Sequence, residues 1–315
     1  MSLDLDALAQ RIASELARAD LVARPNGDVV AGRSPGTTVA SRPVSQLLTA
    51  SSDAPPGVEY VRANARIGDF IDHTLLKAEA TAREVEQLCA EAAENKFAAV
   101  CVNPLWVKLC AQSLTGSEVA VCTVIGFPLG ASRSDVKAFE AQRAVDDGAE
   151  ELDMVAAIGQ IKSGDWHYVA ADIAAVVRAA PGRLVKVIIE SAALTPVEII
   201  KASALARESG AHYVKTSTGF HSSGGASAEA VALMRLIVGD AMGVKASGGV
   251  RDCSAALKMI AAGATRIGTS GGVAMAKCLG PGPLPLRELL ESSLVHGEKC
   301  VTCSVPLAAP GGQVY

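Results

Sequence analysis

From about Ile67 onward, short apolar runs alternate with longer amphipathic stretches. Runs of four to eight apolar residues that are bounded by turn residues are typical of buried strands. We predict eight strands, at residues 68–74, 97–103, 119–127, 150–155, 183–190, 211–217, 242–247 and 265–270. The alternation of these strands with helical stretches indicates an α/β fold.

Several stretches between the predicted strands carry the start and stop signals of helices. Thr81 precedes Glu84 by three residues, which is a capping box. Thr195 is followed by Pro196, and Gly210 ends the same stretch. We predict helices within residues 81–95, 134–149, 195–210 and 251–264.

Strand–helix alternation implies right-handed crossovers and a parallel sheet. Eight units at a spacing of roughly 25–35 residues fit a single closed (β/α)8 TIM barrel better than an open doubly wound sheet. We place this barrel at residues 63–280. An N-terminal extension of one amphipathic helix and a linker precedes it at 1–62, and a C-terminal helix and tail follow at 281–315.

The composition narrows the classes of function. The 315 residues are 50% hydrophobic but only 3% aromatic, and the formal net charge is −4. This balance gives no basic surface for nucleic acid or an anionic membrane. There is no apolar run of about 18 residues, and the N-terminus lacks the features of a signal peptide. We therefore expect a cytoplasmic protein whose partners are small molecules, with assembly into a homodimer or higher homo-oligomer left open.

The eight cysteines do not suggest a disulfide scaffold in a chain of this length. Cys101 and Cys122 lie in apolar runs, where cysteine is usually a small buried hydrophobe. Cys300 and Cys303 have the spacing of half a zinc motif, but a structural zinc site needs four ligands. Because no second pair lies beside them, we expect neither a metal nor a cofactor.

Charged side chains on the predicted strands are candidates for chemistry, since active sites of these barrels lie at the carboxyl ends of the strands. Asp72 ends the first strand, Asp153 lies in the fourth, Lys215 near the end of the sixth and Lys245 in the seventh. A nucleophilic lysine must be uncharged, and a neighbouring cation and an apolar wall both favour that form. The two lysines therefore suggest Schiff-base chemistry, with Asp153 as a proton shuttle. The alternative, in which each lysine only forms a structural ion pair, stays open.

Glycine-rich loops follow the seventh and eighth predicted strands, and each leads into a helix. Loops at these places commonly bind phosphate through backbone N–H groups and helix N-termini. The candidate donors are Ser247, Gly248, Gly249, Gly268, Thr269, Ser270 and Gly271. Glycines that only make tight turns are the alternative, but two such loops in the expected places favour a phosphorylated substrate.

Taken together, these stretches resemble the deoxyribose-phosphate aldolase family. The matching segments, from about Ile71 to Gly271, are IDHTLL, AAVCVNP, VIGFPLG, ELDMV, KVIIE, VKTSTGF, VKASGGVRD and RIGTS. The resemblance implies reversible cleavage of 2-deoxy-D-ribose 5-phosphate to D-glyceraldehyde 3-phosphate and acetaldehyde, through a lysine Schiff base and without a metal. It implies that Lys215 forms the Schiff base, that Lys245 tunes it and that Asp153 transfers protons.

Further residues follow from the same resemblance. We place Asp72, Thr218 and Gly219 among the groups that contact substrate or phosphate. Some family members carry lysine where Phe220 stands, so phosphate binding would rest more on backbone donors here. Some also end in tyrosine on a flexible tail, which makes Tyr315 either a proton donor to the enamine or a frayed terminus. Rival interpretations are another Schiff-base sugar-phosphate aldolase or transaldolase, and a non-catalytic barrel that binds a sugar phosphate.

Overall fold

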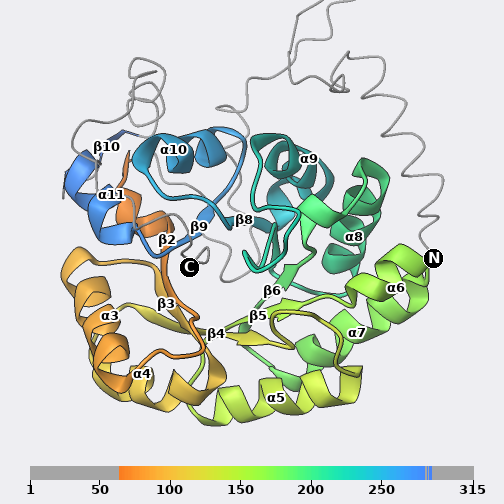
Figure 1. The fold of residues 1–315 in the computed structure, drawn as a ribbon, viewed down its shortest axis with the longest axis horizontal. Coiled ribbons are helices and arrows are strands. Elements are labelled where there is room, and N and C mark those ends of the chain that lie inside the picture. Colours follow the sequence, from red (N-terminus) through yellow and green to blue (C-terminus); the bar gives the residue numbers. More distant parts are fainter. Residues whose placement is uncertain (1–63, 281, 283, 286–315) are drawn as a thin grey trace, which may run out of the picture.

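The computed structural model describes residues 64–280, 282 and 284–285. Within this part of the chain, eight parallel strands close into a barrel, in which the last strand pairs with the first (Figure 1). The strands are β2 (Ile71–Leu75), β3 (Ala99–Val102), β4 (Ala120–Ile125), β5 (Glu151–Val155), β6 (Leu184–Ile188), β7 (Tyr213–Lys215), β8 (Gly243–Ser247) and β9 (Arg266–Thr269). The closed parallel barrel confirms the predicted TIM-barrel fold.

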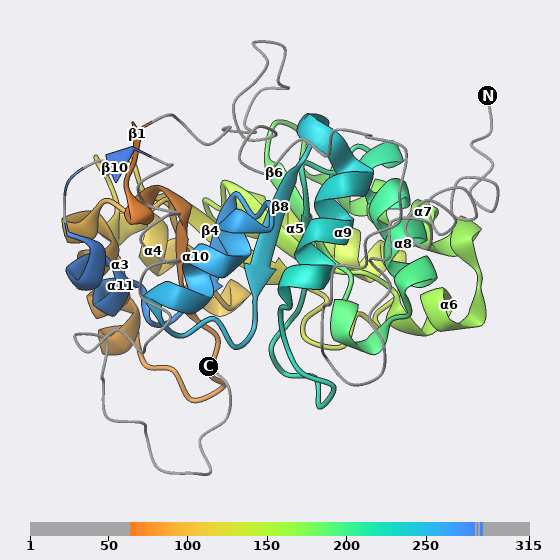
Figure 2. The same ribbon diagram turned by 90° about the horizontal axis from the view of Figure 1, so that it is seen from above.

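Helices surround the barrel, and Figure 2 shows them from the side. The α-helices are α3 (Ala82–Asn95), α4 (Val107–Ser113), α5 (Ser134–Asp146), α6 (Ile158–Ser163), α7 (Trp166–Ala179), α8 (Pro196–Glu208), α9 (Ala228–Val238), α10 (Cys253–Ala261) and α11 (Gly272–Leu279). The short 3-10 turns are η1 (Ile67–Phe70), η2 (Pro104–Trp106), η3 (Ser191–Ala193) and η4 (Gly239–Ala241). Outside the barrel, β1 (Asn64–Ala65) pairs antiparallel with β10 (Leu284–Pro285).

Local hydrogen bonds account for the helix starts. Thr81 Oγ1 accepts the Glu84 N–H, while the Glu84 carboxylate accepts the Thr81 N–H at 2.8 Å, so the predicted capping box is confirmed. Thr195 caps α8 in the same way with Glu198, and Pro196 is its first residue. Since such a box satisfies N–H groups that have no partner within the helix, these starts were readable from sequence. The structure also has α4, α6, α7, α9 and α11, to which the sequence analysis gave no ranges.

The predicted strand boundaries were too wide in places. Residues 68–70 belong to η1 instead of the first barrel strand, because the Asp69 carboxylate accepts the Arg66 N–H at 2.8 Å and closes one turn. Strand β7 has three residues where seven were predicted. Beyond Lys215, the Thr216 hydroxyl accepts the Ser247 N–H at 3.0 Å and donates to the Ser247 carbonyl at 3.1 Å, which replaces part of the regular ladder.

An aliphatic layer lies between the strands and the helices, while the barrel interior holds charged side chains beside a small apolar cluster that includes Ala99 and Val124. Val185 and Val187 of β6 and Ile173 and Val176 of α7 are at most 1% exposed and belong to one apolar core. Side chains alternate along a strand, so Lys186, between the two valines, points to the opposite face. This alternation places charge inside the barrel.

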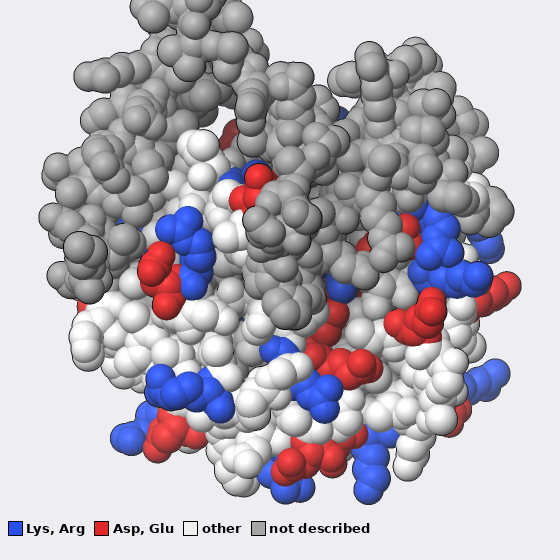
Figure 3. Space-filling model, turned by 180° about the vertical axis from the view of Figure 1, so that it is seen from behind, with Lys and Arg blue, Asp and Glu red and all other residues white. Residues whose placement is uncertain are grey.

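Two features of the described residues bear on membrane and nucleic-acid binding. No helix in the described part of the chain is both long and apolar enough to cross a membrane. On the face seen in Figure 3, acidic and basic side chains of the described residues are intermixed, without a large area of one sign. The predicted extension at 1–62 and nearly all of the predicted segment 281–315 lie outside the described residues.

Candidate active site

Asp153 lies inside the barrel and accepts hydrogen bonds from lysines of three strands. Its Oδ2 accepts from Lys215 Nζ at 2.8 Å and from Lys245 Nζ at 2.7 Å. Its Oδ1 accepts from Lys186 Nζ at 2.8 Å, a lysine to which the sequence analysis gave no role. All four side chains are buried, and Lys215 is 3% exposed. The structure thus brings Lys215, Lys245 and Asp153 together, with the two amines on one carboxylate oxygen.

Two further carboxylates and an arginine continue these contacts. Asp72 accepts from Lys245 Nζ at 2.5 Å and from an Arg266 nitrogen at 2.6 Å. Glu151 accepts from Arg266 at 3.0 Å and lies 2.5 Å from Lys186 Nζ. We call this connected set the interior charge cluster: Asp72, Glu151, Asp153, Lys186, Lys215, Lys245 and Arg266.

Strand register explains how these residues meet. Lys245 of β8 is paired with Lys215 of β7 on one side and with Arg266 of β9 on the other. On β5, Glu151 precedes Asp153 by two residues and therefore points to the same face. Glu151 and Arg266 were not among the candidate residues predicted from the sequence. A count of every second residue along β5 and β9 would have marked both as interior side chains.

Neighbouring charges fix the ionisation of most of the cluster. Burial alone would raise the pKa of Asp153, but Lys186, Lys215 and Lys245 hold it well below its usual value. Burial alone would lower the pKa of Lys245, but Asp153 and Asp72 hold it above its usual value. At neutral pH, Asp153 is therefore a carboxylate and Lys245 is a cation.

The balance of charge singles out Lys215. When all are ionised, the four basic members of the cluster exceed its three carboxylates by one charge. Among the described residues, Lys186 contacts three carboxylates and Lys245 two, whereas Lys215 contacts only Asp153. Lys215 is therefore the lysine of the cluster that is held by a single carboxylate.

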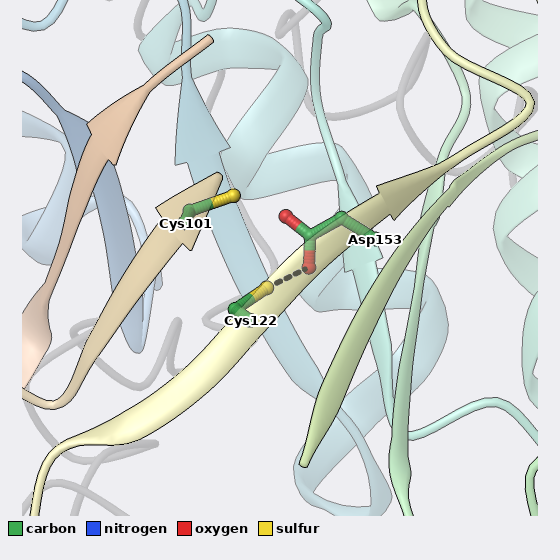
Figure 4. A group of neighbouring side chains, drawn as sticks. All are labelled: Cys101, Cys122 and Asp153. Carbon is green, nitrogen blue, oxygen red and sulfur yellow. Dashed lines mark hydrogen bonds between the residues drawn. The ribbon is translucent and has the colours of Figure 1, made fainter. Parts of the chain in front are cut away.

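Cys101 and Cys122 lie close to Asp153, as Figure 4 shows. Both are fully buried, as predicted. Cys122 is nevertheless more than a small hydrophobe, because its Sγ donates to Asp153 Oδ1 at 3.2 Å and accepts from Lys186 Nζ at 3.2 Å. The apolar run around each cysteine correctly predicted burial, but it could not indicate which polar groups lie across the barrel.

The two glycine-rich loops lead into α10 and α11 at the carboxyl end of the barrel, as predicted. Gly248 and Gly249 have φ angles of +83° and +81°, which other residues rarely adopt. A Cβ on Gly248 would lie 3.1 Å from the Cα of Gly225, so the loops after β7 and β8 pack closely. Gly249 and Ser270 are exposed, and Gly271 is the cap residue of α11. These loops could present backbone N–H groups to an anion.

The hydroxyl groups at this end divide into two kinds. Thr218 Oγ1 donates to Glu190 at 2.5 Å, and Thr269 Oγ1 donates to a backbone carbonyl of the β8–α10 loop at 2.7 Å. Both therefore hold loops in place. Within the described part of the chain, the buried Oγ atoms of Ser217 and Ser247 have no hydrogen-bond partner. Of the predicted hydroxyl donors, Ser247 thus has a buried Oγ without a hydrogen-bond partner among the described residues.

A cavity of about 660 Å³ lies at the opposite end, among residues that precede or begin strands, such as Lys96, Leu184 and Thr265. Glu151 and Arg266 also line it. The interior charge cluster therefore extends from Lys215, at the carboxyl end of β7, to the amino-terminal end of the barrel. The predicted role of Tyr315 falls outside the described residues, as do Cys300 and Cys303.

Known proteins resemble this chain over the same region. The model of the DeoC/LacD family of aldolases matches residues 69–277. A deoxyribose-phosphate aldolase of Lysinibacillus sphaericus is 61% identical over 207 residues, which cover 65% of this chain and 92% of the relative. One of Mannheimia succiniciproducens is 54% identical over 213 residues, covering 68% and 95%. The solved structure of deoxyribose phosphate aldolase from Aeropyrum pernix, described as a unique tetramer, has a TM-score of 0.63 and 34% identity, covering 67% of this chain and 89% of its own.

Proposed function

Because the chain belongs to the DeoC/LacD family of aldolases, we propose that Lys215, Lys245 and Asp153 form its catalytic centre, with Lys215 as the Schiff-base residue. The observation that carries this proposal is the shared Asp153 oxygen, to which Lys215 and Lys245 donate at 2.8 Å and 2.7 Å. A cation held this close to a second amine favours the uncharged form of that amine. An uncharged amine is what attack on a carbonyl requires.

The reaction is the reversible cleavage of 2-deoxy-D-ribose 5-phosphate to D-glyceraldehyde 3-phosphate and acetaldehyde, which makes the protein an aldehyde-lyase. The acetaldehyde carries the first two carbons of the sugar, so the bond between C2 and C3 breaks. Lys215 Nζ adds to C1 of the open-chain aldehyde, and loss of water gives a protonated Schiff base. The C3 hydroxyl loses its proton as the bond breaks, and the electron pair moves into the Schiff base to give an enamine.

Asp153 has the charge and the position to move these protons. As a carboxylate beside Lys215 Nζ, it can accept a proton during formation of the Schiff base and return one during hydrolysis, directly or through a water molecule. Lys245 remains charged beside it. We therefore assign Lys245 the role of keeping Lys215 uncharged, and Asp153 that of proton transfer to and from the substrate.

The mouth of the barrel supplies the features expected of a phosphate site. An anion site there is supported by the N-termini of α10 and α11, by the positive φ angles of Gly248 and Gly249, and by the Oγ of Ser247, which has no hydrogen-bond partner among the described residues. We propose that the substrate phosphate binds at these loops, with Ser270 and Gly271 among its donors. A phosphate contact by Thr218 has less support, because the N–H and the hydroxyl of Thr218 already donate to Glu190.

Other expectations from the sequence remain predictions. We propose that residues 63–280 form the catalytic barrel and that 1–62 and 281–315 flank it. A homo-oligomer is supported by the tetramer described for the Aeropyrum pernix relative. We further propose that the protein acts in the cytoplasm and that Tyr315 transfers a proton to the enamine.

Trapping the covalent intermediate tests the proposed centre. Borohydride should reduce the Schiff base formed with acetaldehyde and leave an ethyl group on Lys215, which peptide mass mapping would locate. Lys186 and Lys245, the other lysines on Asp153, are the internal controls and should stay unlabelled. The Lys215→Met variant should give no label and no cleavage.

The same experiment separates the rival interpretations. A reproducible ethyl label on Lys245 would contradict the assignment of Lys215. Absence of any label in an actively cleaving enzyme would contradict Schiff-base catalysis altogether. Trapping with a larger ketone donor, but not with acetaldehyde, would favour a different Schiff-base aldolase or a transaldolase.

A further inference from the structure

Two thiols and a carboxylate converge inside the barrel. Cys101, Cys122 and Asp153 each offer one ligand atom, and these three atoms lie within 4.8 Å of one another (Figure 4). We propose that they bind a thiophilic divalent cation, Zn²⁺ above all, and that the bound cation inhibits the enzyme. Nothing in the proposed catalytic cycle uses the two thiols, so such a site would share only Asp153 with the chemistry and would regulate it through that carboxylate.

The distances suit a tetrahedral ion. Zinc binds sulfur at about 2.3 Å and carboxylate oxygen at about 2.0–2.2 Å. In a tetrahedron, these lengths put the sulfurs about 3.8 Å apart and each sulfur about 3.5 Å from the oxygen. Cys122 Sγ already lies 3.2 Å from Asp153 Oδ1, and the pairing of Cys101 with Cys122 on β3 and β4 points both side chains to the same face. The three ligand atoms thus lie near the spacing that the ion requires, while Lys186 Nζ, which contacts both Cys122 Sγ and Asp153 Oδ1, must move aside to admit it.

The charge of the surroundings does not exclude the ion. When Zn²⁺ displaces the protons of two thiols, the net charge of the site is unchanged. Lys186 would lose its contacts with Cys122 and Asp153, but it keeps Glu151 at 2.5 Å and Asp72 at 3.5 Å. The remaining facing cations, Lys215 and Lys245, bind the other oxygen of Asp153. No lysine of the cluster is therefore left without a carboxylate.

A second group is a poorer candidate. Asp72, Cys122 and Glu151 also place ligand atoms within 4.8 Å of one another. However, Arg266 donates to both of these carboxylates, and an arginine cannot release its charge to make room for a metal. This group also offers a single sulfur, whereas thiolates are the ligands that select zinc over harder cations.

Inhibition follows from the choice of ligand, and it rests on the proposed function of Asp153. A carboxylate bound to zinc is a much weaker base, so it can no longer accept the proton of Lys215 or of the substrate. A path that admits the substrate to Lys215 also leads to Asp153, because the two are in contact. Loss of activity should therefore accompany occupancy of the site.

Cobalt titration of the full chain tests binding without relying on activity. Co²⁺ bound by thiolates absorbs in the near ultraviolet, and Zn²⁺ should displace it and abolish the absorption. The parent protein should carry Cys300→Ser and Cys303→Ser, so that this pair cannot contribute. Cys101→Ser and Cys122→Ser are the test variants. Cys110→Ser, which replaces a buried cysteine on α4, is the matched control.

The expected result is strong thiolate absorption in the parent and in Cys110→Ser, and its loss in both test variants. Each test variant should bind Zn²⁺ more than about tenfold more weakly, since even loss of a group outside the ligand shell costs roughly that much. Zn²⁺ should inhibit the parent, and a chelator should restore activity. If circular dichroism shows a serine variant to be unfolded, the corresponding alanine variant replaces it.

Other outcomes would overturn the proposal. Thiolate absorption that persists in both test variants, or is lost only in Cys110→Ser, would place the metal elsewhere. Absence of absorption in the parent would rule out the site. Stoichiometric binding without loss of activity would refute the inhibition, while the proposed function would still be judged by the ethyl label on Lys215.

Discussion

Gly268 offers a way to disturb Lys245 without touching any charge. It lies in β9, is buried, and adjoins the side chains of Ser247 and Lys245. A Cβ at this position would lie 2.4 Å from Ser247 Oγ and 3.1 Å from Lys245 Cε. Gly268→Ala should therefore displace both side chains while the interior charge cluster keeps every ionisable group.

The size of the effect follows from these distances. Ordinary contact between such atoms begins near 3.5 Å, so Ser247 Oγ must move by about 1 Å and Lys245 by a few tenths. Overpacking of this kind lowers the free energy of unfolding by about 1–3 kcal/mol. For a domain of this size, each kcal/mol lowers Tm by about 2–4 °C. A misplacement of about 1 Å near the chemistry costs up to about 100-fold in rate. We expect kcat/KM to fall by about tenfold to 100-fold.

Steady-state cleavage of 2-deoxy-D-ribose 5-phosphate and a thermal melt measure the two effects. Gly159→Ala is the matched control, because it makes the same change in α6, where a Cβ would meet nothing within 4 Å. It should leave kcat/KM unchanged and raise stability by about 0.5–1 kcal/mol. If Gly268→Ala folds and retains kcat/KM within a factor of about two of the parent, the argument that a fixed Lys245 supports catalysis is refuted.

The remaining predictions concern charge, phosphate and stability. Lys245→Leu should reduce kcat by about 100-fold or more, and the acid limb of the pH–rate profile should move to higher pH because the activating cation is gone. Asp153→Asn should reduce kcat by about 10²–10⁴-fold, and isotope exchange at the acetaldehyde methyl should slow with it. Gly249→Val should raise KM for the phosphorylated sugar but hardly affect unphosphorylated deoxyribose. Asp172→Asn should cost about 3–5 kcal/mol in denaturant unfolding, since its buried 2.6 Å ion pair with Lys137 is broken, with kcat per folded molecule retained.

A specific result would contradict each of these four predictions. A normal rate and an unshifted acid limb in Lys245→Leu would mean that Lys245 has no part in the mechanism. Cleavage by Asp153→Asn at nearly the parental rate would mean that the Asp153 carboxylate does not transfer protons in the reaction. Equal losses on both sugars would mean that Gly249 does not lie at the phosphate site. A denaturant-unfolding curve unchanged by Asp172→Asn would mean that the ion pair with Lys137 is not a net contributor to stability.

The barrel was predictable from sequence because its signals are local. Apolar runs, capping residues and terminating glycines each reflect the hydrogen bonding or packing of a few neighbouring residues, as Thr81 and Thr195 show. The wide boundary at β7 has a different origin, because Thr216 bonds to Ser247 of the next strand, 31 residues later. A hydrogen bond between residues this far apart produces no periodic pattern in the sequence.

Lys215 and Lys245 were predictable as candidate site residues because a charge inside an apolar run is conspicuous. Glu151 and Arg266 were not found, because each stands at the start of its strand, where a charged residue is as typical of the preceding loop. Alternation along β5 and β9 gives their inward direction only once the bounds of those strands are known. Cys122 was misjudged because its partners Asp153 and Lys186 come from two other strands.

The interior charge cluster has a consequence for how the molecule assembles. Asp72 comes from the first strand of the barrel and Arg266 from the last, 194 residues later, and their ion pair spans the closing seam. If one strand slipped by a single residue, its charged side chain would turn into the aliphatic layer, and each stranded partner would cost about 3–5 kcal/mol. The charges that we propose to act on the substrate thus also destabilise misaligned barrels. A chain that has closed in the wrong register would be both unstable and inactive, so folding fidelity and catalytic competence are selected together.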